Sequence, residues 1–256
     1  MVSERDKAFV EEAFRIIEKG KEKGIVFRLL GSIAVKHHSP KYRYLYDEMK
    51  RPLTDIDLMT YGKFREGMRK FFKDLGYETI NPRFFALYGK KRQIYWSDEK
   101  KWQVDIFFDE LDMCHRVDFR NRLELDDPTI TLTDILLEKM QIVKINPKDI
   151  KDTIIMLLEH DVGDNEEETL NIKYISMLLS KDWGYYYTVT TNLKKVKDYI
   201  GEFSSLTDEN RKVVSDRIDK ILEKIENEPK SLKWKIRAKV GTKKKWYKEV
   251  EEVERG

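Results

Sequence analysis

The chain has 256 residues, of which 40% are hydrophobic and 38% are charged, a composition that excludes a chain disordered throughout and a small disulfide-stabilised domain. Fifty basic and 47 acidic residues leave a net charge of +3, which by itself indicates no partner. The charge is uneven, because residues 230–248 hold nine basic residues and no acidic one, so the remaining chain carries a net charge of −6.

Helix and strand patterns alternate in the first half of the chain. Apolar residues recur at helical spacing through residues 9–17, which predicts an opening amphipathic helix. Residues 25–30 form a short apolar run typical of a buried strand, and Gly31-Ser32 separates it from a short helix at 33–38. The other predicted elements of this half are a loop at 39–52, a strand at 54–59, a helix at 62–75, and strands at 77–80, 84–88, 92–96 and 102–108.

The second half has helical periodicity, and residues 183–196 fit a strand or a helix equally well. We expect an α+β fold with a mixed β-sheet flanked by helices, followed by a helical carboxy-terminal half. The predicted helices of that half lie at 133–143, 150–158, 170–179 and 213–225. The predicted domains are an α/β core at 1–130, a helical domain at 131–228, and a basic tail with aromatic residues at 229–256.

Three acidic residues on predicted strands are candidates for a metal site. Asp55 and Asp57 are two residues apart on one strand, so both side chains project from the same face. Neighbouring carboxylates repel each other unless a cation neutralises them, and Mg²⁺ binds carboxylates together with phosphate oxygens. Asp105 on another strand can complete a two-metal site or accept a proton from an attacking hydroxyl. The turn at Gly31-Ser32 leads into a helix amino terminus, which favours phosphate.

These residues resemble the core signature of the DNA polymerase β-like nucleotidyltransferase superfamily. The matching motifs, within residues 25–110, are Leu30-Gly31-Ser32, Thr54-Asp55-Ile56-Asp57-Leu58 and Val104-Asp105-Ile106. The resemblance implies a nucleotidyltransferase-type fold in which Gly31 and Ser32 bind the nucleotide. It implies that Asp55 and Asp57 bind Mg²⁺, or Mn²⁺ in its place. It makes Asp105 the third metal ligand and the general base.

A weaker match lies in the second half of the chain. Residues 136–140 and 148–152 resemble motifs of the AbiEii-like branch of the superfamily, which includes the nucleotidyltransferase toxins of toxin–antitoxin systems. Arg51 ahead of the paired aspartates fits the form common in that branch. By this resemblance Lys139 contacts nucleotide phosphates, and an antitoxin protein is a partner. Arg51, Asp149 and Asp152 support the site.

Several of these residues also have structural explanations. Asp105 on a hairpin can face solvent, and Lys139 on a helix can be a solvated side chain. If Asn146 caps a helix, Asp149 falls at its third position, where a carboxylate stabilises the first turn. The long separation between the glycine turn and the paired aspartates indicates an insertion at residues 40–49 near the site, whose role is open.

The sequence indicates no zinc site, because its histidines and single cysteine lack metal-ligand spacing. These residues are His37, His38, His115, His160 and Cys114. A single cysteine cannot form an internal disulfide, which favours a reducing compartment. The amino terminus lacks the apolar segment of a signal peptide, and no apolar run is long enough to span a membrane, so we expect a cytoplasmic protein with no membrane partner.

The sequence therefore predicts a Mg²⁺-dependent nucleotidyltransferase that transfers a nucleoside monophosphate from an NTP to an acceptor hydroxyl and releases pyrophosphate. The basic tail contains Trp234, Trp246 and Tyr247, a composition typical of a contact with a phosphate backbone. This favours RNA, such as tRNA, as the acceptor, while a small molecule or a protein side chain fits the same core. The alternatives are a solvated, partly disordered tail and, for the whole chain, a catalytically inactive nucleotide- or RNA-binding protein on the same scaffold.

Overall fold

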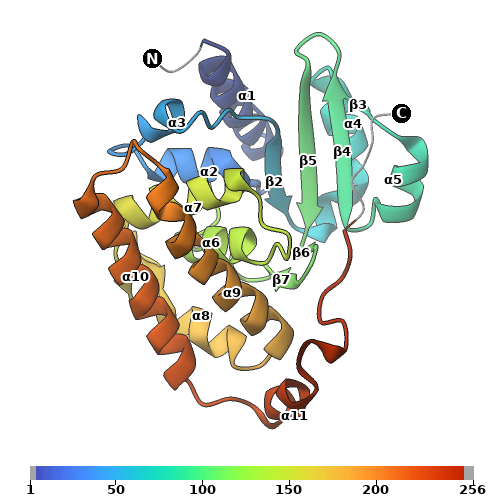
Figure 1. Ribbon diagram of the computed structural model, residues 1–256. Helices are drawn as coiled ribbons and strands as arrows, with labels where there is room; N and C mark the ends of the chain where they lie inside the picture. The colour runs from blue at the N-terminus through green and yellow to red at the C-terminus, as the bar shows by residue number, and fades with distance from the viewer. Residues whose placement is uncertain (1–3, 251–256) are drawn as a thin grey trace.

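The computed structural model describes residues 4–250, in which a mixed sheet is flanked by helices (Figure 1). The predicted α+β class is confirmed. The central strand order is β1-β2-β5-β4-β3; β2 and β5 are parallel and the other pairs are antiparallel. Two further strands, β6 and β7, extend from β5. The bounds are β1 (Arg28–Leu29), β2 (Ile56–Thr60), β3 (Glu78–Thr79), β4 (Arg92–Ser97), β5 (Trp102–Phe108), β6 (Glu110–Asp112) and β7 (Arg116–Asp118).

The register of β2 against β5 separates apolar from acidic side chains. Asp57 is paired with Asp105, whereas the next residue, Leu58, is paired with Ile106. Because successive side chains point to opposite faces of a strand, Leu58 and Ile106 share one face and the two aspartates share the other. Leu58 and Ile106 are fully buried. The acidic pair is therefore placed by the same alternation that places the core.

Two helices, α1 (Glu4–Lys21) and α4 (Met68–Asp74), cover the apolar face of the sheet. Phe9 of α1 meets Trp102 of β5 edge to face, with ring centroids 5.3 Å apart. Phe72 of α4 stacks on Tyr95 of β4 with centroids 4.4 Å apart. Aromatic pairs of this kind contribute about 0.5–1.5 kcal/mol beyond their area burial. These contacts leave the opposite face of β2 and β5 for the acidic residues.

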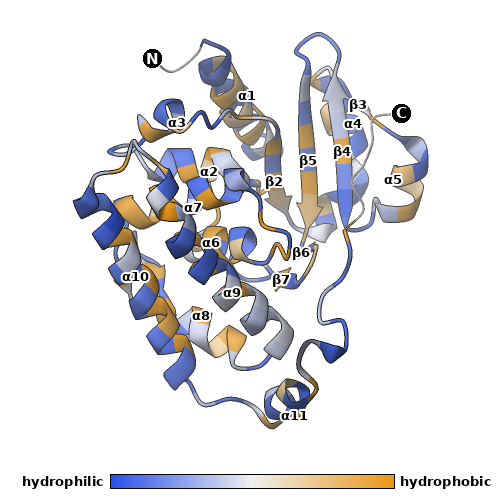
Figure 2. Cartoon of the chain, viewed as in Figure 1, coloured by the Kyte–Doolittle hydropathy of each residue, from blue (hydrophilic) through white to orange (hydrophobic). Residues whose placement is uncertain are grey.

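The helices of the second half pack on α2 and on one another. Both α6 and α7 contact α2, and α10 packs on α7, α8 and α9, with hydrophilic residues along its outer side (Figure 2). The bounds are α2 (Gly31–His38), α6 (Leu132–Met140), α7 (Pro147–Glu159), α8 (Ile172–Leu179), α9 (Trp183–Tyr199) and α10 (Asp208–Asn227), with a strand pair β8 (Val162–Gly163) and β9 (Leu170–Asn171). The ambiguous segment at 183–196 is helical, and the domain boundary near residue 130 stays a prediction.

The basic tail packs against the body of the protein. It begins with α11 (Leu232–Val240) and runs to the end of the sheet where β4 begins (Figure 1). Trp246 Nε1 donates a hydrogen bond to Thr188 Oγ1 at 3.0 Å, and the backbone N–H of Lys248 donates to the Cys114 carbonyl at 3.0 Å. A disordered tail is therefore wrong for residues 232–250, and the remainder of the predicted tail, 251–256, lies outside the described residues.

The predicted strand at 84–88 is wrong, because these residues belong to helix α5 (Pro82–Tyr88). Asn81 Oδ1 accepts hydrogen bonds from two backbone N–H groups of the first turn, at 2.9 and 3.1 Å. Pro82 occupies the first turn, where its missing N–H costs no hydrogen bond. The capping signal thus outweighs the strand preference of the aromatic residues that follow.

Two other segments differ from their predicted secondary structure. The predicted loop at 39–52 contains a helical turn, α3 (Leu45–Glu48), and the predicted helix at 62–75 begins as a 3₁₀ turn, η1 (Gly62–Gly67), before α4. Among residues 4–250, no helix has the length and apolar character needed to cross a membrane.

Candidate active site

The three predicted carboxylates line one cavity of about 370 Å³. Asp57 and Asp105 are paired across β2 and β5, whose backbones lie about 4.8 Å apart as neighbouring strands do. Asp55 precedes β2 on the same side of the chain and faces the same cavity. Four other residues that the sequence singled out also line it: Ser32, Arg51, Lys139 and Asp149.

The carboxylates of Asp55 and Asp105 repel the carboxylate of Asp57. Burial raises the pKa of Asp57 well above its usual value, and the neighbouring charges of Asp55 and Asp105 raise it further. A cation among these oxygens would relieve the repulsion and lower that pKa. The three carboxylates offer only oxygen donors, the ligand type that Mg²⁺ and Mn²⁺ prefer. The residues present therefore fit a divalent oxygen-binding metal ion.

Asp105 has partners that the sequence did not indicate. Arg92 Nε donates a hydrogen bond to Asp105 Oδ2 at 3.0 Å, Arg92 Nη2 donates to the same oxygen, and Gln103 Nε2 donates to Oδ1 at 2.9 Å. Burial raises the pKa of Asp105, although the charge of Arg92 opposes this shift. Arg92 lies on β4 opposite Phe107, a diagonal cross-strand position that only the strand register reveals.

The glycine turn lies directly against Asp57. Gly31 has a φ of 65°, a left-handed conformation that glycine adopts without a Cβ penalty. A Cβ atom there would lie 2.6 Å from Asp57 Oδ2, so the position requires glycine for space as well. The Gly31 N–H donates a hydrogen bond to Glu138 Oε2 at 3.1 Å. The predicted glycine turn and Asp57 are thus in contact.

A buried network of charges surrounds the other side of the cavity. Arg51 donates two hydrogen bonds to Asp152, from Nε to Oδ1 at 2.9 Å and from Nη2 to Oδ2 at 2.7 Å. Lys139 Nζ lies 3.2 Å from Asp149 Oδ1 and 3.2 Å from Asp152 Oδ2. Although burial alone would lower the pKa of Lys139, its carboxylate neighbours raise it. Asp152 is fully buried and does not line the cavity, so it acts through Arg51 and Lys139.

The segment 40–49, which the sequence predicted to be an insertion, packs against the glycine turn. Tyr46 of α3 is buried, and its hydroxyl donates a hydrogen bond to the Ser32 carbonyl at 3.1 Å. The Arg51 backbone N–H donates to the Tyr46 carbonyl at 2.7 Å. The insertion therefore connects Ser32 with Arg51 and supports both ends of the cavity wall.

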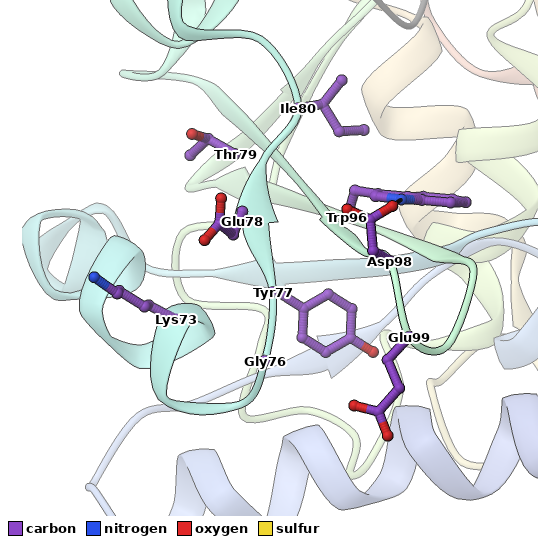
Figure 3. Close-up of a pocket in the computed structure, with 9 residues that line it drawn as sticks. All are labelled: Lys73, Gly76, Tyr77, Glu78, Thr79, Ile80, Trp96, Asp98 and Glu99. Atoms are coloured by element: carbon purple, nitrogen blue, oxygen red, sulfur yellow. Dashed lines mark hydrogen bonds between the residues drawn. The ribbon is translucent and has the colours of Figure 1, made fainter.

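A second hollow, of about 620 Å³, lies at the β3 edge and shares no lining residue with the first (Figure 3). Its acidic side chains, Glu78, Asp98 and Glu99, lie apart from one another. Trp96 Nε1 donates a hydrogen bond to Asp98 Oδ1 at 3.0 Å. Because no acidic groups converge in this hollow, we take the cavity at Asp57 as the candidate active site.

No protein-family model and no curated protein matches the sequence. One solved structure is similar to the chain, the solution structure of the antibiotic-resistance factor ANT(2'')-Ia. The two share 12% sequence identity, and the similarity covers 86% of this chain and 96% of that chain with a TM-score of 0.38. A similarity of this size shows nothing about the activity of the present chain.

We predict that Asp152→Ala destabilises the protein by about 3–5 kcal/mol, because it leaves Arg51 and Lys139 buried without a shared counter-ion. Urea unfolding measures this change. The matched control is Asp161→Ala, which removes an ion pair whose acid is 80% exposed and should cost about 1 kcal/mol or less. Equal costs for the two variants would contradict the structural role of Asp152.

We predict a pH-dependent effect at Glu138. Burial raises the pKa of Glu138 to about 7, so the folded protein holds a proton that the unfolded chain has already lost. This proton favours folding fully below about pH 4.5, and the benefit disappears as the pH rises to about 7. Glu138→Gln keeps an oxygen that accepts the hydrogen bond from Gly31 but cannot ionise. It should therefore abolish the decrease in the free energy of unfolding, of up to about 3 kcal/mol, that wild type shows as the pH rises.

Urea unfolding of the metal-free protein across this pH range measures the slope of the unfolding free energy against pH for wild type and Glu138→Gln. The exposed Glu66 supplies the control variant, Glu66→Gln, which should leave the slope unchanged. A slope that Glu138→Gln does not alter would show that Glu138 ionises normally in the folded protein.

Proposed function

We propose that the protein is a Mg²⁺-dependent nucleotidyltransferase that transfers a nucleoside monophosphate from an NTP to an acceptor hydroxyl and releases pyrophosphate. The observation that carries this proposal is the parallel register of β2 and β5, which pairs Asp57 with Asp105 in a cavity that Asp55 and Ser32 also line. The resemblance of these motifs to the DNA polymerase β-like superfamily supports it, and the match of Lys139, Asp149 and Asp152 to the AbiEii-like branch is part of the same proposal.

In the proposed reaction the acceptor oxygen attacks the α-phosphorus of the NTP. A phosphorus–oxygen bond forms there, the bond to the oxygen that bridges to the β-phosphate breaks, and pyrophosphate leaves. Asp55 and Asp57 hold the divalent ion, which when bound neutralises negative charge on the phosphates in the transition state. Ser32 and the amino terminus of α2 orient the phosphates. The role of Lys139 is to supply positive charge at the cavity wall.

Asp105 is the proposed general base. Its Oδ1 accepts a hydrogen bond from Gln103, while Arg92 donates to Oδ2, so Oδ1 keeps a lone pair for the acceptor proton. Burial raises the pKa of Asp105, which brings it closer to the operating pH where a base is effective. Arg92 then positions the carboxylate and stabilises it between turnovers.

The acceptor side of the site is aromatic and basic. The cavity shares Arg92, Phe107, Met113 and Val250 with a neighbouring hollow of about 730 Å³. That hollow also holds Phe84 and Tyr88, whose ring centroids lie 5.0 Å apart. Aromatic faces stack on bases, and basic side chains bind phosphates, in proteins that bind single-stranded nucleic acids. We therefore propose RNA, such as tRNA, as the acceptor.

A non-catalytic nucleotide- or RNA-binding protein is the second candidate. The observation that favours it is the ion pair between Arg92 and Asp105, because a carboxylate with a fixed counter-ion has less need of a metal ion or a proton. The two functions differ in one measurable result, which is the transfer of a labelled nucleotide.

We predict that Asp57→Asn lowers Mg²⁺-dependent transfer of labelled nucleoside monophosphate by about 100-fold or more, because the metal loses a ligand. The same variant should raise the thermal unfolding midpoint of the metal-free protein, since it removes one of the repelling charges. Asp216→Asn, on the exposed face of α10, is the matched control and should change neither quantity.

Transfer by Asp57→Asn within a few-fold of wild type would contradict the proposed function. The assay offers each labelled NTP with Mg²⁺ to total RNA, small hydroxylated molecules and protein. If wild type binds NTP with Mg²⁺ but labels none of these acceptors, the non-catalytic function is supported instead.

We predict that the basic tail contributes phosphate contacts to RNA binding. Replacing three exposed tail lysines by glutamine should weaken RNA binding and reduce the slope of log K against log salt concentration by about 2–3. The three are Lys239, Lys243 and Lys244. The control replaces three exposed lysines outside the tail, Lys70, Lys194 and Lys212. Equal losses in both triple variants, or no loss in either, would contradict a tail contact.

A further inference from the structure

Two buried histidines and a glutamate meet at the end of the helix pair α2 and α7. His38 is the last residue of α2, His160 follows the last turn of α7, and Glu168 precedes β9. His38 Nδ1 lies 3.6 Å from one Glu168 carboxylate oxygen, and His160 Nδ1 lies 3.5 Å from the other. One ligand atom from each residue lies within 4.8 Å of the other two. The three side chains therefore converge on one point.

The hydrogen bonds of the two rings leave the Nδ1 atom of His160 facing only hydrogen-bond acceptors. His160 Nε2 lies 2.6 Å from the His38 carbonyl oxygen, which can only accept, so Nε2 carries a proton. His160 Nδ1 then faces the backbone oxygen of Glu168 at 3.3 Å as well as its carboxylate, and both are acceptors. His38 Nδ1 faces the same carboxylate. A cation between the two Nδ1 atoms and the carboxylate would give the lone pair of each nitrogen a partner.

The outer partners of both rings are those of metal-bound histidines. His38 Nε2 lies 2.6 Å from Thr129 Oγ1 and 3.5 Å from Asp126 Oδ2, while His160 Nε2 donates to a backbone carbonyl. Hydrogen bonds of this kind fix the ring tautomer and point the free nitrogen at the metal. His38 and His160 are both buried, so their orientations are set before any ion binds.

We propose that His38, His160 and Glu168 bind a zinc ion through the two Nδ1 atoms and a carboxylate oxygen, with a water molecule as the fourth ligand. Ligands bound about 2.1 Å from a tetrahedral zinc ion lie about 3.4 Å apart, and the two imidazole–carboxylate separations of 3.6 and 3.5 Å, each to a different oxygen of Glu168, are close to this spacing. Imidazole and carboxylate donors together suit zinc better than Mg²⁺. The sequence did not predict the site because the two histidines are separated by 122 positions.

The zinc ion would link two helices that also build the candidate active site. The amino-terminal ends of α2 and α7 carry Ser32 and Asp149, which line the cavity at Asp57. Their carboxy-terminal ends carry His38 and precede His160, and the two helices lie side by side (Figure 1). A metal ion at the far ends therefore fastens the pair without touching the cavity, and it stabilises the folded chain by mass action.

The test is calorimetric titration of the metal-free 256-residue chain with zinc chloride, with millimolar Mg²⁺ present to occupy the carboxylate site. We expect one equivalent of zinc to bind with a Kd of about 1 µM or below and to raise the thermal unfolding midpoint. His160→Gln should weaken binding by about 100-fold or more. Cobalt(II), whose visible absorption reports a tetrahedral site, should bind with the same stoichiometry.

Glu168 offers a variant that leaves the hydrophobic core undisturbed. The Glu168 side chain is 72% exposed, so Glu168→Gln should fold normally and still weaken zinc binding by about 10-fold or more. The matched control is Glu167→Gln, an exposed neighbour on the same loop, which should bind zinc like wild type. Absence of zinc binding to wild type, or equal binding by the Glu167 and Glu168 variants, would overturn the proposal.

Discussion

The parallel pairing of β2 with β5 places Asp57 beside Asp105 on the face of the sheet opposite to the one that α1 and α4 cover. Burial and the charges of Asp55 and Asp105 raise the pKa of Asp57. The strand register therefore places an ionised Asp57 carboxylate in an unfavourable electrostatic environment. Two features of the candidate active site accommodate Asp57. The glycine turn gives Asp57 room, and the cavity gives access to a neutralising ion.

The protein neutralises its buried acids in two different ways. On one wall of the cavity, Arg51 and Lys139 are fixed partners of Asp152 and Asp149, so those acids have little need of an external ion. Asp55 and Asp57 have no such basic partner among the hydrogen bonds and ion pairs of residues 4–250, where Asp55 accepts only from the Thr54 hydroxyl. A site with fixed cations on one wall and free carboxylates on the other suits a substrate that arrives with its own divalent ion, as an NTP does.

Local patterns were enough to predict the carboxylates and the glycine turn. Alternation around Asp57 and around Asp105 predicted the strands and the shared face, because side-chain direction has a period of two. The Asn81 cap of α5 is also a local signal, although the aromatic residues at 84–88 led to the wrong prediction of a strand there. Arg92, Glu138 and the histidine cluster were missed for a different reason. Their partners lie on other strands or helices, and no spacing along the chain reports such contacts.

In the proposed function, Asp55 and Asp57 hold a divalent ion together with a nucleotide. Crystals soaked with Mn²⁺ and a non-hydrolysable NTP analogue test it most directly, because Mn²⁺ scatters anomalously at accessible wavelengths. We expect an anomalous peak about 2.2 Å from carboxylate oxygens of Asp55 and Asp57, with the triphosphate beside Ser32. A nucleotide bound elsewhere, or a triphosphate beside Ser32 with no anomalous peak at the aspartates, would contradict the claim.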